Sequence, residues 1–199
     1  MERAEYRCVY EAGPVIRWER IDAIALTDTV DGGAPRLKTT VKMCRTDDAV
    51  HVRFECEDDH VVATYGKRDD PLYLEDVVEV FIDEQRAGTR YKEYEISPRN
   101  VVFDALIDKK PGERPIVHTE WDDAGLRSNV TTAEDGAWVC DIAFAIDSFD
   151  ERPVSGTRWN VNFYRIDGDP EGNRHFYAWS PTGRIDFHRP EKFGTVLFA

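Results

Sequence analysis

The feature that most constrains this chain is a period of two in its apolar residues. Apolar and polar residues alternate in the segments 50–57, 78–83, 91–97, 138–146 and 159–164. In the first of them, Val52 and Phe54 fall on one parity and Arg53 and Glu55 on the other. Such alternation is typical of β-strands that bury one face and expose the other. It indicates that the chain folds mainly as sheet.

Weaker patterns complete an all-β prediction. Further strands are expected at 37–44, 101–107, 117–120, 126–132 and 193–198. No window of 12 or more residues keeps a 3.6-residue apolar stripe, and only 21–26 and 146–149 could hold a helical turn. Strands at regular spacing, separated by Gly, Pro and Asp turns, favour a sandwich. We therefore predict an all-β fold, an antiparallel β-sandwich of the immunoglobulin-like or jelly-roll kind with few short helical turns.

The composition indicates one folded domain with an acidic surface. The chain has 199 residues, 41% of them hydrophobic, and no linker, repeat or low-complexity tract, so we expect 1–199 to form a single domain. Its 39 acidic and 26 basic side chains leave a net charge of −13. Nucleic acids and acidic membranes are disfavoured as partners, because both attract basic surfaces. The oligomeric state stays open.

The apolar runs and the N-terminal segment bear on location. No apolar run approaches the ~18–20 residues of a membrane span. The opening segment MERAEYRCVYEAGPVIRWER carries charges from its second residue and lacks the apolar stretch of a signal peptide. We expect a cytoplasmic protein.

The cysteines and histidines do not form a metal or redox motif. Cys8, Cys44, Cys56 and Cys140 lie outside any CxxC pair, and none of the five histidines has zinc-ligand spacing. We expect four free thiols. Phosphate-binding glycine loops and a GxSxG nucleophile motif are also missing from the sequence.

The acidic residues allow two kinds of chemistry. Glu79, Glu93 and Glu95 fall in neighbouring strand segments, and a pair of carboxyl groups ~5–9 Å apart can cleave a glycosidic bond. The acidic turns 57–59 and 69–70 could supply oxygen ligands to calcium. Each pattern is equally compatible with solvated acidic loops and chance pairs in so acidic a chain.

Some strands carry unusual residues on the face opposite the core. Asn160, Asn162 and Tyr164 share this parity in one strand, as do Glu79 and Phe81 in another. Planar amides and carboxylates can hold sugar hydroxyls, and aromatic rings stack on the C–H faces of sugars. The pattern predicts either a ligand-binding surface or an ordinary exposed face.

Five segments together resemble carbohydrate-binding module family 9. They are YLEDVVEVFID at 73–83, the segment 91–100, WNVNFYR at 159–165, YAWSPT at 177–182 and FHRPEKFG at 187–194. The resemblance covers nearly the whole chain in order and is weakest before Thr39. It implies a DOMON-like β-sandwich that binds a terminal sugar between two aromatic rings, with calcium ions in structural roles.

The resemblance also implies site residues. Tyr73 and Phe187 fall where the family has its two sandwiching tryptophans, and Glu79 matches its sugar-binding glutamate. The other expected site residues are Arg99, Asn100, Asn162, Arg174 and Trp179.

The function we expect is non-catalytic carbohydrate binding. The ligand would be a mono- or oligosaccharide, with its reducing end as one option, held in an aromatic-walled pocket. The resemblance implies association with glycoside hydrolases and with carbohydrate catabolism, and no cofactor besides structural calcium. Two alternatives stay open. A DOMON haem or redox-partner domain would need an axial ligand, for which Met43 is the internal methionine; a glycoside-processing enzyme component is the other.

Overall fold

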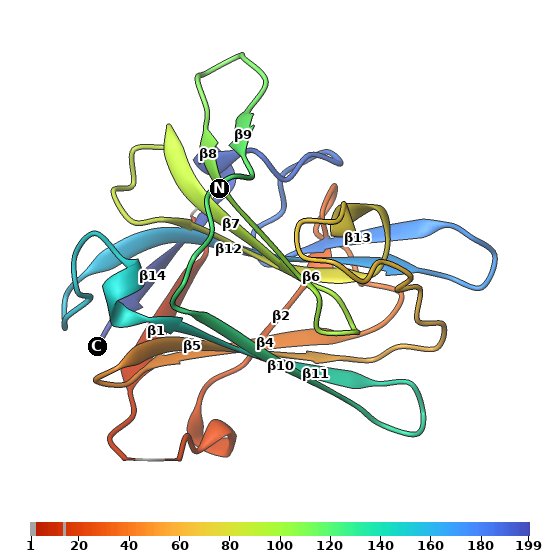
Figure 1. The fold of residues 1–199 in the computed structure, drawn as a ribbon, viewed down its shortest axis with the longest axis horizontal. Helices are drawn as coiled ribbons and strands as arrows, with labels where there is room; N and C mark the ends of the chain where they lie inside the picture. The colour runs from red at the N-terminus through yellow and green to blue at the C-terminus, as the bar shows by residue number, and fades with distance from the viewer. Residues whose placement is uncertain (1–2, 14) are drawn as a thin grey trace.

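The computed structural model describes residues 3–13 and 15–199 and shows an all-β fold (Figure 1). The strands are β1 (Glu5–Tyr10), β2 (Ile24–Ala25), β3 (Thr27–Asp28), β4 (Thr39–Arg45), β5 (Ala49–Cys56), β6 (Val77–Asp83), β7 (Arg90–Ile96), β8 (Val102–Asp108), β9 (Ile116–His118), β10 (Leu126–Thr132), β11 (Trp138–Ala145), β12 (Arg158–Gly168), β13 (Arg174–Ala178) and β14 (Gly194–Phe198). Four short 3-10 turns join them: η1 (Trp18–Arg20), η2 (Leu72–Leu74), η3 (Ile146–Ser148) and η4 (Pro190–Lys192). A helix long and apolar enough to cross a membrane is not found in the described residues.

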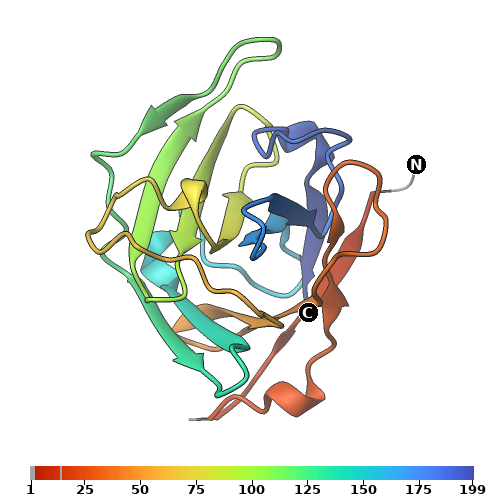
Figure 2. The ribbon, with the colours of Figure 1, turned by 90° about the vertical axis from the view of Figure 1, so that its right-hand side faces the viewer.

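The strands form two layers that belong to one curled sheet. The strand order is β10-β11-β5-β4-β1-β14-β12-β6-β7-β8-β9, with β13 pairing β12 and β2 pairing β4. Figure 1 shows β12, β6, β7 and β8 in one layer and β4, β5, β10 and β11 in the other, and the turned view in Figure 2 shows both curving around the core.

The sheet is mixed, which corrects the prediction of a strictly antiparallel sandwich. Residues 5–8 of β1 pair with β14, residues 9–10 pair with β4, and both pairings are parallel. β1 thus passes from one layer to the other and joins them. Alternation in a sequence reports which face of a strand is buried, and it carries no information on the direction of the neighbouring strand.

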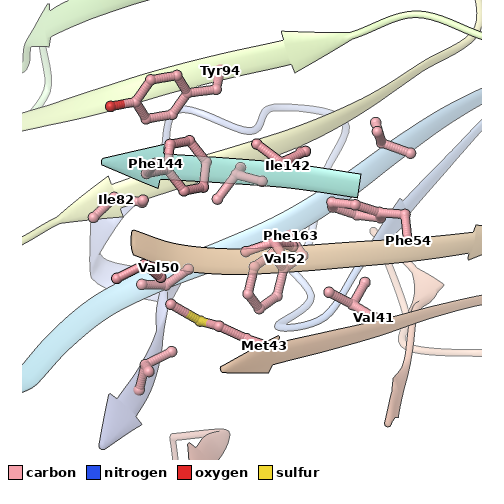
Figure 3. Close-up of a cluster of buried hydrophobic side chains, with 14 of the residues drawn as sticks. Val41, Met43, Val50, Val52, Phe54, Ile82, Tyr94, Ile142, Phe144 and Phe163 are labelled. Atoms are coloured by element: carbon pink, nitrogen blue, oxygen red, sulfur yellow. The ribbon is translucent and has the colours of Figure 1, made fainter. Parts of the chain in front are cut away.

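The main core lies between the layers and follows the predicted parities. Figure 3 shows Val52 of β5 beside Phe163 of β12, with Phe54 of β5 and Phe144 of β11 in the same cluster. Trp138 and Trp159 are buried in the same core. The four cysteines are buried free thiols.

A second apolar cluster lies on the outer face of the layer that contains β12, β6, β7 and β8. Phe81, Tyr91, Phe103, Tyr164 and Phe193 pack there, so every residue of β6 is buried. Glu79 shares this face and is 1% exposed. The sequence left open either a ligand-binding surface or an ordinary exposed face here; in the structure, a segment near the C-terminus and the turn η2 pack against part of this face.

An arginine holds the two layers together at one end. Arg165 of β12 is fully buried and pairs with Asp58, 3.0 Å away, and with Asp167, 2.6 Å away. The same guanidinium donates to the hydroxyl of Thr39 on β4 and lies over the ring of Trp138 on β11. The interior charge is therefore matched by partners from both layers.

The turn predictions were partly correct. The predicted turn at 146–149 is η3. The segment 21–26 is instead extended, with β2 pairing β4, and the 3-10 turn lies just before it at η1.

Candidate functional site

A pocket of about 560 Å³ opens on the outer face of the layer that contains β6, β7 and β8. These strands and β12 form its floor. The turn η2, the start of β13, the end of β9 and the loop 185–188 form its walls. Apolar and aromatic side chains line most of it, and the polar groups gather at its floor.

The floor is built from two rows of side chains that cross the sheet. In the first row, Tyr164, Glu79, Glu95 and Phe103 lie side by side on β12, β6, β7 and β8. In the next row, Glu93 of β7 is paired with Phe81 of β6. Since side chains two apart on a strand point to the same face, this register places three carboxyl groups together.

Glu79, Glu93 and Glu95, here called the glutamate trio, are buried at the floor. They are 1%, 5% and 1% exposed, and one carboxylate oxygen from each lies within 4.8 Å of the others. Oε1 of Glu79 and Oε2 of Glu95 have no hydrogen-bond partner in the described part of the chain. Buried acceptors of this kind are costly unless a partner reaches them.

Burial raises the pKa of every member of the trio. The pKa of Glu93 rises to about 8 because its carboxylate loses its hydration. The pKa values of Glu79 and Glu95 lie well above 4.5 for the same reason, and repulsion from neighbouring carboxylates adds to the effect. Arg174 opposes the shift at Glu79 through its positive charge.

Aromatic rings form one wall of the pocket. Phe187 stacks flat on Tyr164, with centroids 4.0 Å apart and planes 10° from parallel. The hydroxyl of Tyr164 donates to the backbone oxygen of Phe187 at 3.0 Å, which fixes the loop above the sheet. Phe176 of β13 meets Phe187 edge-on, with centroids 6.2 Å apart.

Arg174 and Tyr73 form another part of the wall. The guanidinium of Arg174 lies 5.1 Å from the ring centre of Phe176 and donates to the backbone oxygen of Tyr73. Tyr73, in η2, is 46% exposed and lines the mouth. The turn η2 is thus tied to β13 beside the pocket.

His188 lines the pocket next to Phe187 and is neutral near pH 7. Burial lowers its pKa to about 4. Its Nε2 lies 4.0 Å from Oε1 of Glu93, and its Nδ1 shares a hydrogen bond of 2.9 Å with the Tyr91 hydroxyl. His188 therefore brings no positive charge to the trio.

Four of the eight expected site residues line this pocket together: Tyr73, Glu79, Arg174 and Phe187. They come from η2, β6, β13 and the loop after β13. Their roles in binding stay predictions, but the fold places them in one cavity.

Asn162 and Trp179 lie elsewhere, which corrects the expected site. The amide of Asn162 is buried and exchanges two hydrogen bonds with the backbone of Ser180, so it joins β12 to the chain after β13. Trp179 points into the core between the layers, where its ring meets Phe163. A Cβ at Gly194 would lie 2.5 Å from this indole, so the glycine makes room for it.

Arg99 and Asn100 occupy the turn between β7 and β8, outside the pocket lining. Arg99 reaches the carbonyls of Ala63 and Thr64 at 3.5 Å. Asn100 has a positive φ of 59° and donates to the carbonyl of Ser128. Neither residue contributes to the pocket lining, and their role in binding stays a prediction.

Sequence reasoning missed several other residues of the lining. Phe103, Phe176 and His188 belong to the pocket. Phe103 has the same parity as its buried neighbours, so the pattern could not separate it from core. His188 was visible only as a member of the FHRPEKFG segment.

The acidic turns 57–59 and 69–70 were expected to supply ligands to calcium. Their carboxylates have different partners in the structure. Asp58 is engaged by Arg165 and the indole of Trp138, and Asp59 by Arg36, so both carboxylates already have partners. Asp69 lies in a cluster with Asp104 and Asp122, which offers three oxygen ligands within 4.8 Å. Arg68 pairs with both Asp104 and Asp122. Calcium binding stays a prediction for this cluster.

The haem alternative depended on Met43, and its position does not fit that role. Met43 is fully buried in the core between the layers, among Val41, Val52 and Phe163 (Figure 3). An axial ligand must face a cavity large enough for the macrocycle. Met43 does not line the pocket described above.

A protein-family model described as carbohydrate family 9 binding domain-like matches residues 16–199. The chain belongs to this family. The match confirms the resemblance found in the sequence segments and extends it toward the N-terminus.

Relatives and solved structures agree with this family 9 assignment. A protein named "Extracellular protein" from the fungus Arthroderma benhamiae is 24% identical over 199 residues, which covers 93% of this chain and 88% of the relative. A family 9 carbohydrate-binding module from Caldicellulosiruptor kristjanssonii, solved with cellotriose, has a TM-score of 0.72 at 15% identity and covers 98% of this chain and 93% of the module. The same module was also solved with glucose.

A protein from Bacteroides uniformis shares the fold over its whole length. Its TM-score is 0.78 at 18% identity, with both chains covered completely. At these identities the likeness establishes the fold of this family 9 domain and leaves its ligand to be argued from its own pocket.

Proposed function

We propose that this family 9 domain binds a carbohydrate without catalysis and takes one terminal sugar of a mono- or oligosaccharide into the pocket on β6, β7 and β8. The observation that carries the proposal is the cavity itself, which joins aromatic walls to a floor of hydrogen-bonding carboxyl groups. The family 9 module with similar fold was solved with glucose and with cellotriose, which supports the same ligand class here.

The pocket offers a sugar both kinds of contact that it needs. The rings of Phe187 and Tyr73 can stack on C–H faces, each contributing ~0.5–1.5 kcal/mol beyond area burial. Glu79 offers an acceptor without a partner, and Arg174 at the wall is a donor. A volume of about 560 Å³ is within the range of small-molecule sites.

Replacing Tyr73 by Ala should weaken sugar binding by about five- to tenfold, because a stacking ring is lost. Isothermal titration with glucose, cellobiose and cellotriose measures this. Tyr10→Ala is the matched control, since Tyr10 is 40% exposed and lies outside the pocket lining. Equal loss in both variants, or none in Tyr73→Ala, would contradict the assigned pocket.

Recognition of the reducing end belongs to the same proposal. The pocket ends at a closed floor of buried side chains, so it suits the end of a saccharide better than its middle. Titration with methyl glycosides, which block the anomeric hydroxyl, should show weaker binding than the free sugars. Equal affinities would contradict recognition of the reducing end and would show that another part of the sugar contacts the floor.

A glycoside-processing role is the alternative, because the trio resembles a set of catalytic carboxyl groups. Turnover of chromogenic glycosides above the background rate would favour it over simple binding. Association with glycoside hydrolases and with carbohydrate catabolism stays a prediction that follows from the family.

A further inference from the structure

The floor of the pocket gathers more carboxyl groups than a neutral sugar requires. Three buried carboxyl groups meet there, with Asp186 in the loop above. Asp186 is paired with Arg184. In the described part of the chain, no cation makes an ion pair with the trio, since His188 is neutral and Arg174 is directed at the backbone of Tyr73.

Two acceptor atoms of the trio are left without partners. Oε1 of Glu79 and Oε2 of Glu95 are buried, and both residues line the cavity. Buried acceptors without a partner are rare in folded proteins unless a ligand supplies the missing hydrogen bonds. A ligand that completes them must supply hydrogen-bond donors, and a positive charge on that ligand would also favour the ionised form of the trio.

The walls determine which cation fits. Phe81, Phe103, Phe176 and Phe187 surround the floor with rings. A bare divalent ion would need further oxygen ligands from water in this apolar surrounding. A primary ammonium group has three N–H donors, matches three carboxyl groups, and is attracted to ring faces. The carbon skeleton that carries the ammonium group would fill the aromatic part of the pocket.

We propose that the pocket selects a sugar that bears a protonated amine, with the ammonium group on the glutamate trio and the ring against the aromatic walls. This inference rests on the proposed sugar-binding function and names the ligand class of the same site. The overall charge of −13 draws cationic ligands toward the protein as well.

The test is isothermal titration with matched pairs of sugars. Glucosamine, galactosamine and mannosamine are compared at pH 6.5 with glucose, galactose and mannose, and N-acetylglucosamine serves as the neutral amide. At least one amino sugar should bind about tenfold tighter than its neutral partner, because charge-assisted hydrogen bonds are about twice as strong as neutral ones. Sodium chloride should reduce this preference by screening.

Variants assign the preference to the trio. Glu93→Gln should remove most of the preference for the amine, measured as the ratio between the affinities of an amino sugar and its neutral partner in the same variant. Glu134→Gln, at an exposed site in the β10–β11 turn, is the matched control and should keep the preference. Circular dichroism establishes that each variant is folded.

A second measurement needs no variant. A carboxyl group that holds a proton in the free protein must release it when an ammonium group binds, and a neutral sugar does not require this. Titration in two buffers of different ionisation enthalpy measures proton release. The groups that face the trio are Arg174 from β13, His188 and Asp186 from the loop, and Tyr91 from β7.

The outcomes separate this inference from the proposed function. If a neutral sugar binds and its amino partner binds no tighter, the amine preference is overturned and sugar binding stands. If none of the sugars binds, both proposals fail. If methylammonium or calcium chloride alone binds as tightly as the amino sugar, the floor is a simple cation site and the inference is overturned.

Discussion

At the scale of single residues, ionisation of the buried glutamate trio destabilises the folded state. Each carboxyl group has a raised pKa, so the folded state binds protons more tightly than the unfolded chain. The stability that comes from protonation is fully present below the ordinary pKa of 4.5 and is lost as pH rises through the folded value, about 8 for Glu93. This trend is opposite to that of a salt-bridged carboxylate.

Glu93→Gln should therefore stabilise the protein at alkaline pH. The amide keeps the shape of the side chain and cannot ionise, so we expect a gain of about 1–3 kcal/mol in the free energy of unfolding at pH 8. At pH 4 the two proteins should agree within about 0.5 kcal/mol, because Glu93 is then protonated in the folded state and mostly protonated in the unfolded chain as well. Urea unfolding across this pH range measures the difference.

The pH dependence separates this effect from simple repacking. Glu134→Gln, at an exposed turn, should follow the natural chain at every pH. A constant offset between Glu93→Gln and the natural chain from pH 4 to 8 would show that the raised pKa is not the cause.

At the scale of elements, β12 has two functions on its two faces. Tyr164 on the outer face supports Phe187 at the pocket, and Arg165 on the inner face joins the two layers. Successive side chains of a strand point to opposite faces, so neighbouring residues serve the site and the core. The position of the site thus depends on the same strand that carries the buried ion network.

Arg165→Met should cost about 3–5 kcal/mol of stability, because it leaves Asp58 buried without its guanidinium partner. Asp167 keeps a second partner in Arg36, 2.8 Å away, which limits the loss. Arg53→Met is the matched control: its pair with Asp141 is partly exposed, and we expect a cost of about 0–1 kcal/mol. Similar costs in both variants, measured by urea unfolding, would argue against the interior role of Arg165.

At the scale of the whole molecule, the excess of acidic groups makes stability sensitive to cations. The net charge is −13, and Asp69, Asp104 and Asp122 form a cluster with only Arg68 as counter-charge in the described residues. Repulsion among like charges destabilises the folded state, and salt reduces this repulsion. The cytoplasmic location expected from the N-terminal segment stays a prediction; the fungal relative is named an extracellular protein.

Calcium should raise the thermal midpoint, and EDTA should lower it if the purified protein carries calcium. A ligand that binds only the folded state stabilises it by about 2.7 kcal/mol at 100 times its dissociation constant. Sodium chloride at equal ionic strength controls for general screening, and Asp122→Asn should reduce the calcium effect. A midpoint that responds equally to sodium and calcium would contradict a specific site.

Most of the strands, their buried faces and the family could be predicted from the sequence, whereas β1, β2, β3 and β13 were not predicted. Alternation at 50–57 and 138–146 predicted β5 and β11 and their core residues, because burial of one face imposes a period of two. The segments around 73–83 and 187–194 were enough to indicate the family and to bring Tyr73, Glu79 and Phe187 into the expected site. These features are local, so they can be read along the chain.

The partners of each strand, and the side chains that its faces contact, could be known only from the three-dimensional structure. Parity does not name the neighbouring strand, its direction or its register, so the parallel pairings of β1 could not be predicted. Parity also does not name the contacts of a side chain. Asn162 and Glu79 share a face, but only Glu79 lines the pocket, because the backbone of Ser180 engages the amide of Asn162. The pairing of Glu79 with Glu95 across β6 and β7 assembles the glutamate trio, since contacts between strands depend on register set by the whole fold.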